Sequence, residues 1–277
     1  MINAYYNGEY GTRETIKVPL TDRAIYFGDG IYEAAIGKNG IIYLEEEHLS
    51  RFFKNSNELN LKPNFSKEQL KNILYELIAE CKFECFFIYF QLTRNGKERS
   101  HTYTSCDPNL LVTVSEVDSP SPERILRTIT LDDRRHSFCG IKTLNLLPSV
   151  IASQTASVNN CDESILIKNG TVTECAHSNV FIINEEKLIT RPTDGTILPG
   201  ITRKRLIELA YNNDIAVEER LFGANELLSA DEVLITSSSK LCLRVSSVNG
   251  KKYKLRENSL GNSLCHLIYR DFIKYTS

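Results

Sequence analysis

The chain has 277 residues, a hydrophobic content of 42% and 33 basic against 35 acidic side chains, for a formal net charge of -2. This length favours two folded domains. The weak charge gives no general attraction to nucleic acid or to an anionic membrane, so the expected partners are small molecules. The first residues lack the basic and apolar blocks of a signal peptide and no apolar run could span a membrane, so we expect a cytoplasmic protein.

Hairpins and helices are predicted to alternate in the first half of the chain. Asn-Gly pairs at 7–8 and 39–40 indicate tight turns between short strands, because these residues supply the positive φ angles that two-residue hairpins need. Apolar residues recur at helical spacing after position 44, and Ser66 is placed to cap a second helix. The elements that follow from these patterns are helices over 44–61 and 66–81 and buried strands over 86–94 and 109–117.

The stretch "DSPSPE" at 118–123 is the expected linker between two domains, since its prolines and serines can extend neither flanking element. It separates a smaller domain over 1–117 from a larger domain over 124–277, which would carry Lys142. The elements predicted after the linker are a strand over 124–131, a helix over 149–160, strands within 163–191, a helix over 200–213, a hairpin within 231–254 and a helix over 260–276. Regular βαβ alternation is missing from this order, which indicates an α+β fold.

Cysteine usage points to free thiols. The eight cysteines stand at 81, 85, 106, 139, 161, 175, 242 and 265, with no C-x-x-C pair and no Cys/His spacing typical of a zinc site. We therefore expect reduced, mostly structural thiols and no bound metal.

Lys142 stands in the stretch "GIKTLNLLPSV", between Ile141 and a run that contains Leu144, Leu146 and Leu147. Apolar neighbours penalise an ammonium, so such a lysine either reaches back to solvent or serves a chemical purpose. A lysine that loses its proton near neutral pH can attack a carbonyl and form an imine. Lys142 is therefore the first candidate for a catalytic residue.

Two segments could bind a phosphate. Pro199 and Gly200 precede an amphipathic helix, and the first backbone amides of that helix, those of Ile201 and Thr202, would carry the partial positive charge that attracts anions. The hydroxyls of "ITSSSK" at 235–240 could add contacts at a strand end. Serine-rich strand ends are commonly no more than turns, so that interpretation stays open.

Two further segments carry charges that suit a small ligand. Glu174 lies between Val172 and Val180, and a carboxylate buried there would need a partner such as a protonated heterocycle nitrogen. Arg99 and His101 alternate across one serine, so in an extended segment they share a face that suits a carboxylate. A surface glutamate and a solvated charged loop are the alternative interpretations.

Five stretches, taken together and in chain order, resemble the class IV aminotransferases, the fold-type IV enzymes that use pyridoxal 5'-phosphate. They are "DRAIYFGDGIYE" at 22–33, "HLSRFFKNSNEL" at 48–59, "KTLNLLPSV" at 142–150, "TECAHSNVF" at 173–181 and "DGTILPGITR" at 194–203. The resemblance covers nearly the whole chain. It implies a two-domain α+β architecture with the cofactor at the domain interface.

The resemblance also implies a role for each candidate residue. Lys142 would be the Schiff-base lysine, and Glu174 would pair with the pyridine nitrogen and keep it protonated. Leu198 would pack on one face of the ring. The phosphate would be bound by Arg51, by the backbone amides of Ile201 and Thr202 and by the Ser238 hydroxyl.

Within the family, D-amino acid aminotransferases compete with two other enzymes. "RSH" at 99–101 resembles the carboxylate trap of the D-amino acid enzymes, in which Arg99 and His101 would reach in from the neighbouring subunit of a homodimer and Tyr32 would complete the site. The sequence "KTLNLL" at 142–147 and the chain length also favour the D-amino acid enzymes. The expected activity is therefore ping-pong transfer of an amino group from a D-alanine-like amino acid to a 2-oxo acid such as 2-oxoglutarate.

The alternatives use the same cofactor site. An aminodeoxychorismate lyase would convert 4-amino-4-deoxychorismate to 4-aminobenzoate and pyruvate, and a branched-chain enzyme would act on L-amino acids. A cofactor-storing protein that has lost catalysis is a third alternative. The complete set of Lys142, Glu174 and Arg51 argues against it.

Several residues depart from the family pattern. Cys175 stands where glycine is common, Ala176 and His177 stand where small or serine-rich residues are common, and Arg244 replaces the proline of a usual Pro-Val pair. His177 could contact the cofactor or substrate, or be a structural histidine. Arg244 could bind an acidic side chain, or lie at the surface. The preferred donor and acceptor therefore stay open.

Overall fold

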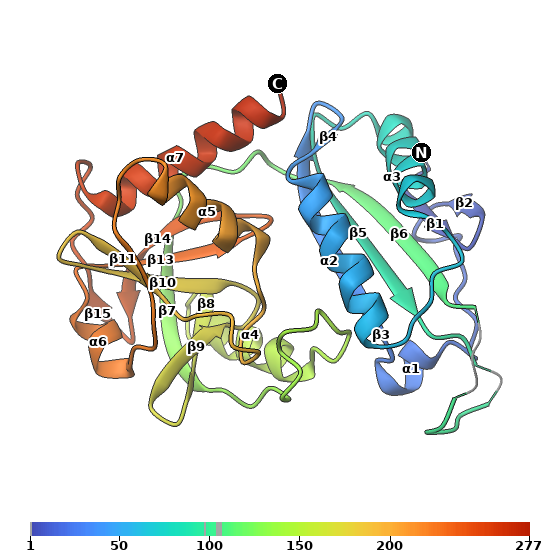
Figure 1. Cartoon of the computed structure of the whole chain (residues 1–277), viewed down its shortest axis with the longest axis horizontal. Coiled ribbons are helices and arrows are strands. Elements are labelled where there is room, and N and C mark those ends of the chain that lie inside the picture. Colours follow the sequence, from blue (N-terminus) through green and yellow to red (C-terminus); the bar gives the residue numbers. More distant parts are fainter. Residues whose placement is uncertain (1, 97, 104–106) are drawn as a thin grey trace. The chain divides into compact units, whose positions relative to one another are not determined.

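The computed structural model describes residues 2–96, 98–103 and 107–277. The chain divides into two compact units, both of which combine helices with a sheet, so the predicted α+β class is confirmed (Figure 1). The first unit comprises Met1–Ser119, Ile141–Asn145 and Tyr275–Ser277, and the second comprises Pro120–Gly140 and Leu146–Lys274. The first boundary between them falls after Ser119, within the segment expected as the linker.

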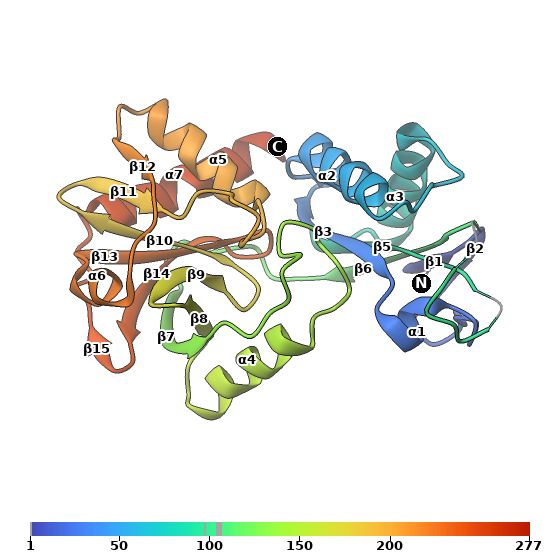
Figure 2. The same cartoon turned by 60° about the horizontal axis from the view of Figure 1, so that its bottom comes forward.

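The first unit is built on a six-stranded antiparallel sheet with the strand order β2-β1-β6-β5-β3-β4. Its strands are β1 (Ala4–Tyr6), β2 (Glu9–Gly11), β3 (Gly30–Lys38), β4 (Ile41–Ile42), β5 (Cys85–Thr93) and β6 (Asn109–Glu116). Helices α2 (Glu45–Glu58) and α3 (Lys67–Cys81) cover one face of this sheet (Figure 2). A short helix that the sequence patterns did not predict, α1 (Arg23–Phe27), precedes β3.

The core of the first unit lies between the sheet and these two helices. Leu49 and Phe52 of α2 and Leu74 of α3 are buried in one apolar cluster with Ile31 and Phe90 of the strands. The predicted cap of α3 is confirmed as a capping box: the amide of Gln69 donates to Ser66 Oγ at 3.2 Å, and the amide of Ser66 donates to Gln69 Oε1 at 2.7 Å. A cap of this kind stabilises a helix by about 1 kcal/mol.

The Asn-Gly pairs form turns as predicted. Asn7 and Gly8 have φ angles of 46° and 99° between β1 and β2, and Asn39 and Gly40 have φ angles of 52° and 80° between β3 and β4. Both residues of each pair lie in the positive-φ region that a twisted two-residue hairpin requires. Equivalent pairs at 169–170 and 249–250 join two strand pairs of the second unit.

The segment that carries Lys142 belongs to the first unit, which corrects the expected domain assignment. It runs antiparallel along the edge of β3, where Ile31 and Thr143 form a bridge. The amide of Tyr32 donates to Lys142 O at 2.9 Å, and the amide of Leu144 donates to Gly30 O at 3.1 Å. The prediction was wrong because sequence order places residue 142 after the linker, whereas the hydrogen bonds that hold the segment are made with a strand more than 100 residues earlier.

The second unit is built on a nine-stranded mixed sheet with the strand order β12-β11-β10-β13-β14-β7-β8-β9, and β15 pairs with β14. The strands are β7 (Ile125–Asp132), β8 (Glu163–Lys168), β9 (Thr171–Cys175), β10 (Asn179–Asn184), β11 (Lys187–Thr190), β12 (Val217–Glu219), β13 (Glu232–Ser237), β14 (Leu241–Val248) and β15 (Lys251–Lys252). Its helices are α4 (Leu147–Val158), α5 (Ile201–Tyr211), α6 (Ala224–Ser229) and α7 (Leu260–Tyr275).

Parallel pairs are more frequent in the second unit than the sequence order suggested. Strands β7 and β8 are parallel and are joined through α4, and β11 and β12 are parallel and are joined through α5. Two crossovers of the βαβ kind therefore sit within an otherwise hairpin-rich unit. The strands and the helix of the first crossover were predicted, but their pairing was not. The second crossover was missed because β12 has three residues, too few to give a strand pattern of its own.

Helix length and thiol chemistry complete the description of the fold. In the part of the chain that the structure describes, no helix is both long enough and apolar enough to cross a membrane. The seven described cysteines are free thiols and most are buried. Cys106, which was grouped with them in the sequence, lies outside the described residues.

Candidate active site

Lys142 and Tyr32 lie together at the edge of the first sheet. Cross-strand neighbours share a face, so the Lys142 side chain lies on the same face as Tyr32. Lys142 Nζ is 4.2 Å from the centroid of the Tyr32 ring, a distance at which the ring face attracts an ammonium. The Tyr32 ring in turn stacks on Tyr89, with 5.5 Å between the ring centroids. The structure thus brings together the predicted catalytic lysine and one predicted substrate residue.

Arg51 is held by a buried carboxylate that the sequence patterns did not single out. Arg51 Nε and Nη2 donate to the two Glu33 oxygens at 2.7 and 3.0 Å, and His48 Nδ1 lies 2.6 Å from Glu33 Oε2. This bidentate pair uses two of the five guanidinium N–H donors. The signal that could have found the group is the placement of His48 three residues before Arg51, on one helix face.

Electrostatics in this group favour a charged Glu33. Burial by itself raises the pKa of Glu33, but Arg51 and His48 outweigh burial and lower that pKa from about 4.5 to about 2. Burial lowers the pKa of His48, so its neutral ring donates a hydrogen bond to Glu33. Glu33 therefore orients the head of Arg51 in the first unit.

Replacing Glu33 with glutamine is expected to destabilise the protein by about 3–5 kcal/mol at pH 7, the usual cost of removing one partner from a buried ion pair. The folded-state pKa of Glu33 lies below its unfolded value, so the stabilisation is present above about pH 4.5 and is lost as the pH falls toward 2. Denaturant unfolding at pH 7 and pH 3 measures the free energy of unfolding of the variant and of the wild type. The variant and the wild type should differ clearly at pH 7 and less at pH 3, and equal stability at pH 7 would contradict the assignment.

The loop with Arg99 and His101 gathers around Phe27. The Arg99 guanidinium carbon lies 5.2 Å from the centroid of the Phe27 ring, and the His101 ring centroid is also 5.2 Å from it. Arg23, which is buried, donates to the carbonyl oxygens of Ser100 and His101. Arg23 was not among the predicted residues, and it restrains the backbone from which the Arg99 and His101 side chains extend.

Glu174 is buried in the second unit, so its alternative interpretation as a surface glutamate is wrong. It lies in β9, and its Oε1 accepts hydrogen bonds from the amide of Leu198 at 3.0 Å and from Arg135 Nη1. Its Oε2 accepts from Asn179 Nδ2 at 2.8 Å. Three donors therefore hold this carboxylate in place. One of them is the backbone amide of Leu198, which is itself a predicted cofactor residue.

Arg135 is the main residue that sequence reasoning missed near Glu174. It follows β7 and is also paired with Asp133, through Nη2 to Oδ2 at 2.7 Å and Nε to Oδ1 at 2.9 Å. Burial raises the pKa of Asp133, but Arg135 and the Thr173 hydroxyl outweigh burial and lower it. The guanidinium is thus shared between two carboxylates and restrains the Glu174 head group. The Asp-x-Arg spacing directly after a strand was the only available signal.

The start of α5 is open to an anion. Its N-cap is Gly200, which offers no side-chain cap, so the first-turn amides of Ile201 and Thr202 are available to a ligand. A Cβ at Gly200 would lie 1.9 Å from Asn179 Oδ1, so any other residue there would displace the Asn179 side chain. Asn179 Nδ2 also donates to Leu198 O at 3.0 Å. Asn179 therefore ties Glu174 to the start of α5.

These features of the second unit fit a phosphorylated pyridine cofactor. A phosphate suits the uncapped α5 N-terminus, and a protonated ring nitrogen suits a buried carboxylate. Ser238 lies half-buried in the turn between β13 and β14. The nearby Thr236 Oγ1 is buried without a hydrogen-bond partner among the described residues. A hydrogen bond with a bound ligand would satisfy this hydroxyl.

The residues that depart from the family pattern lie in different environments. Cys175 is fully buried, which raises the pKa of its thiol well above the ordinary value. Arg244 is buried, so its interpretation as a surface residue is wrong, and its Nη1 donates to Arg256 O at 3.1 Å. His177 is half-exposed and lies 3.1 Å from the buried carboxylate of Glu163.

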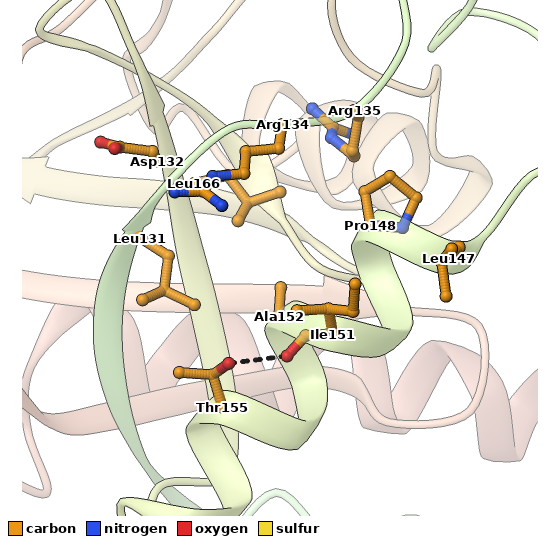
Figure 3. A pocket seen from close by; sticks show the side chains of 10 residues that line it. All are labelled: Leu131, Asp132, Arg134, Arg135, Leu147, Pro148, Ile151, Ala152, Thr155 and Leu166. Carbon is orange, nitrogen blue, oxygen red and sulfur yellow. Dashed lines mark hydrogen bonds between the residues drawn. The ribbon is translucent and has the colours of Figure 1, made fainter.

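A pocket of about 390 Å³ opens beside α4 in the second unit (Figure 3). Leu147, Pro148, Ile151 and Ala152 of α4 form one wall, and charged side chains approach it from the segment after β7. Arg135 lines the pocket and also binds Glu174, so the pocket adjoins the predicted cofactor residues of this unit. The complete lining is Leu131, Asp132, Arg134, Arg135, Leu147, Pro148, Ile151, Ala152, Thr155 and Leu166.

Sequence comparison identifies relatives along nearly the whole chain. The family model for amino-transferase class IV matches residues 30–248. The D-alanine aminotransferase of Bacillus licheniformis is 35% identical over 249 residues, which cover 89% of this chain and 88% of the relative. The D-alanine aminotransferase of Staphylococcus epidermidis is 32% identical over an alignment of 279 positions, which covers 99% of this chain and 98% of the relative.

Structure comparison finds the same architecture in more distant proteins. A branched-chain aminotransferase from Thermoproteus uzoniensis, solved with norvaline, superposes with a TM-score of 0.91 at 19% identity, covering 100% of this chain and 96% of the other. A putative 4-amino-4-deoxychorismate lyase from Legionella pneumophila gives a TM-score of 0.86 at 22% identity, covering 94% and 97%. At these identities the likeness bears on the fold alone, and it confirms the predicted fold-type IV architecture.

Proposed function

The chain belongs to the class IV aminotransferases, which are pyridoxal 5'-phosphate enzymes, and from this premise we propose that it transfers the amino group of a D-alanine-like amino acid to a 2-oxo acid such as 2-oxoglutarate. The observation that carries the proposal is the identity of 32–35% to proteins named D-alanine aminotransferase over most of the chain. The reaction would run in two halves, with the amino group held on the protein between them.

The cofactor roles proposed for single residues follow from the family to which the chain belongs. Arg51, the amides of Ile201 and Thr202, and Ser238 would bind its phosphate, and Leu198 would pack on its ring. Glu174 would accept a hydrogen bond from the protonated ring nitrogen. Its carboxylate is suited to this role because it is buried and held in place. When bound, the cofactor supplies an electron-withdrawing ring that stabilises negative charge at the substrate Cα.

Lys142 would hold the cofactor covalently and, once displaced by the amino donor, move the proton at the substrate Cα. Its backbone is fixed along β3, and its Nζ lies over the Tyr32 ring. A base placed by a rigid strand edge is well suited to a proton transfer that needs a fixed geometry.

The substrate carboxylate would be bound by Arg99 and His101, with Tyr32 completing the site. The Arg99 and His101 side chains both contact the Phe27 ring, which supports a shared role in binding one anion. Arg23 donates hydrogen bonds to the carbonyl oxygens of Ser100 and His101 and so restrains this loop. A restrained loop loses less entropy when a ligand binds.

The experiment that tests the proposal compares donors and acceptors in steady state. The purified protein with cofactor receives D-alanine or L-leucine together with 2-oxoglutarate, and separately 4-amino-4-deoxychorismate with no acceptor. We expect turnover of D-alanine. Double-reciprocal plots of the initial rate should give parallel lines when both substrates are varied. Intersecting lines would contradict the two-half mechanism. Turnover of L-leucine alone would favour the branched-chain alternative, and pyruvate release without an acceptor would favour the lyase.

A homodimer is part of the proposal, and the exposed side of α4 supports it. Leu147, Val150, Ile151 and Val158 recur at helical spacing and are 57–69% exposed, whereas Ala152 and Ala156 on the other side are buried. An exposed apolar row without charges commonly marks a protein contact. We propose a second copy of this chain as the partner that covers it, with Arg99 and His101 of each copy serving the other copy's site.

Mixed dimers are expected to recover activity if Arg99 acts on the partner subunit. Lys142→Ala and Arg99→Ala chains, each nearly inactive alone, would be unfolded together in equal amounts and refolded. Each mixed dimer would then hold one doubly defective site and one intact site, so roughly a quarter of all sites would regain the wild-type set. D-Alanine transamination is the measurement, with each variant refolded alone as the control. No gain over the controls, despite proven subunit exchange, would contradict the shared site.

A further inference from the structure

Two turns meet at one end of the second sheet and carry basic side chains that the cofactor roles do not use. His177 lies in the turn between β9 and β10, and Lys240 lies in the turn between β13 and β14. Strands β10 and β13 pair with Asn179 opposite Thr236, which places both turns at the same end of the sheet. Lys240 Nζ is 3.3 Å from His177 Nε2.

A buried carboxylate anchors this pair. Glu163 Oε2 lies 3.1 Å from His177 Nε2 and accepts a hydrogen bond from Ser178 Oγ at 2.9 Å. Ser153 Oγ of α4 is 3.5 Å from the other ring nitrogen of His177. The imidazole is therefore held from both sides, by the sheet and by α4, with a fixed orientation.

Lys240 differs from His177 in its charge balance. The described residues include no carboxylate within 4 Å of its ammonium, although it is half-buried. His177 Nε2 either donates its proton to Glu163 or accepts from Lys240, so the His177 contact engages at most one of the three N–H donors of the ammonium. A cation in this setting is suited to an anion that arrives with a ligand.

The cluster also lies next to the predicted cofactor residues of the same unit. His177 is three residues after Glu174, in a turn closed by the amide of Cys175 donating to Ser178 O at 2.7 Å. Lys240 is two residues after Ser238, and its amide donates to Ser237 Oγ at 3.2 Å. Lys240 therefore shares a turn with Ser238, and His177 lies in the turn that follows the strand of Glu174.

We propose that Lys240, positioned by His177 and Glu163, binds the distal carboxylate of a dicarboxylic substrate such as 2-oxoglutarate or D-glutamate. The inference rests on the proposed transamination and adds to it the determinant of acidic side chains. It also gives a role to His177, which stands where the family commonly has a small residue.

The test compares two acceptors that differ only in the distal carboxylate, 2-oxoglutarate and 2-oxopentanoate, with D-alanine as the donor. Lys240→Met is expected to raise the KM for 2-oxoglutarate about tenfold or more, which corresponds to one charge-assisted hydrogen bond. The KM for 2-oxopentanoate should stay within about twofold, because that acceptor has no carboxylate to lose. Lys240→Arg should recover part of the loss.

The control is Lys252→Met, which removes an exposed lysine from β15 of the same unit and should change neither KM. Equal changes for both acceptors, or no change for 2-oxoglutarate, would overturn the inference. A weaker affinity for the cofactor itself, measured by its release on dilution, would overturn it too and would assign Lys240 to the phosphate. If the wild type transaminated D-alanine with neither acceptor, the proposed function would fail instead.

Discussion

Lys142→Ala is expected to reduce D-alanine transamination by about 10⁴-fold or more, because in the proposed mechanism this one side chain would serve both as the covalent anchor and as the proton carrier. The segment around residue 142 is held by backbone hydrogen bonds to β3, so the variant should fold normally. Cofactor binding should weaken without being abolished, since the phosphate contacts remain. Turnover, the unfolding midpoint and cofactor retention are measured together.

The matched control is Lys38→Ala, which removes a lysine from the other end of β3 and breaks a contact with the exposed Glu84 at 3.4 Å. Its turnover should stay close to that of the wild type. Substantial turnover by the Lys142 variant, with the control behaving as expected, would show that another residue carries the chemistry.

Glu174→Gln is expected to lower kcat about 10- to 100-fold, because the proposed hydrogen bond to the ring nitrogen, a charged one worth about 1.5–3 kcal/mol, would become a neutral one. The loss should fall on cleavage of the Cα–H bond, where negative charge develops at the substrate. The deuterium isotope effect on kcat with 2-deuterio-D-alanine should therefore increase in this variant.

A structural effect of the same substitution would give a different result, since Glu174 also binds Arg135 and Asn179. Loosening of that network would weaken cofactor binding and lower the unfolding midpoint while leaving the isotope effect unchanged. An unchanged isotope effect would contradict the proposed role of Glu174 at the ring nitrogen, whatever the size of the loss in kcat.

Local patterns in the sequence predicted most of the elements. The Asn-Gly turns and the Ser66 cap depend on a few neighbouring residues, and they occur as predicted. Short elements were missed for the complementary reason. Helix α1 has five residues and β12 has three, so neither is long enough to show a hydrophobic period.

Contacts distant in sequence could not be predicted from the chain alone. The pairing of Arg135 with Glu174 joins residues 39 positions apart, and that of Arg51 with Glu33 joins residues 18 apart. The placement of Lys142 along β3 depends on the same kind of contact. The resemblance named Lys142, Glu174 and Arg51, whereas the residues that hold them in place became visible only in three dimensions.

The half-reaction with single amino donors tests the central claim most directly. The purified protein loaded with cofactor is mixed, without any acceptor, with D-alanine, D-glutamate or L-leucine, and the visible absorption band of the bound cofactor is followed while released 2-oxo acid is quantified. We predict that D-alanine depletes the band and releases a stoichiometric amount of pyruvate, that D-glutamate does the same with 2-oxoglutarate, and that L-leucine leaves the band unchanged. Depletion by L-leucine with no response to either D-amino acid would contradict the account.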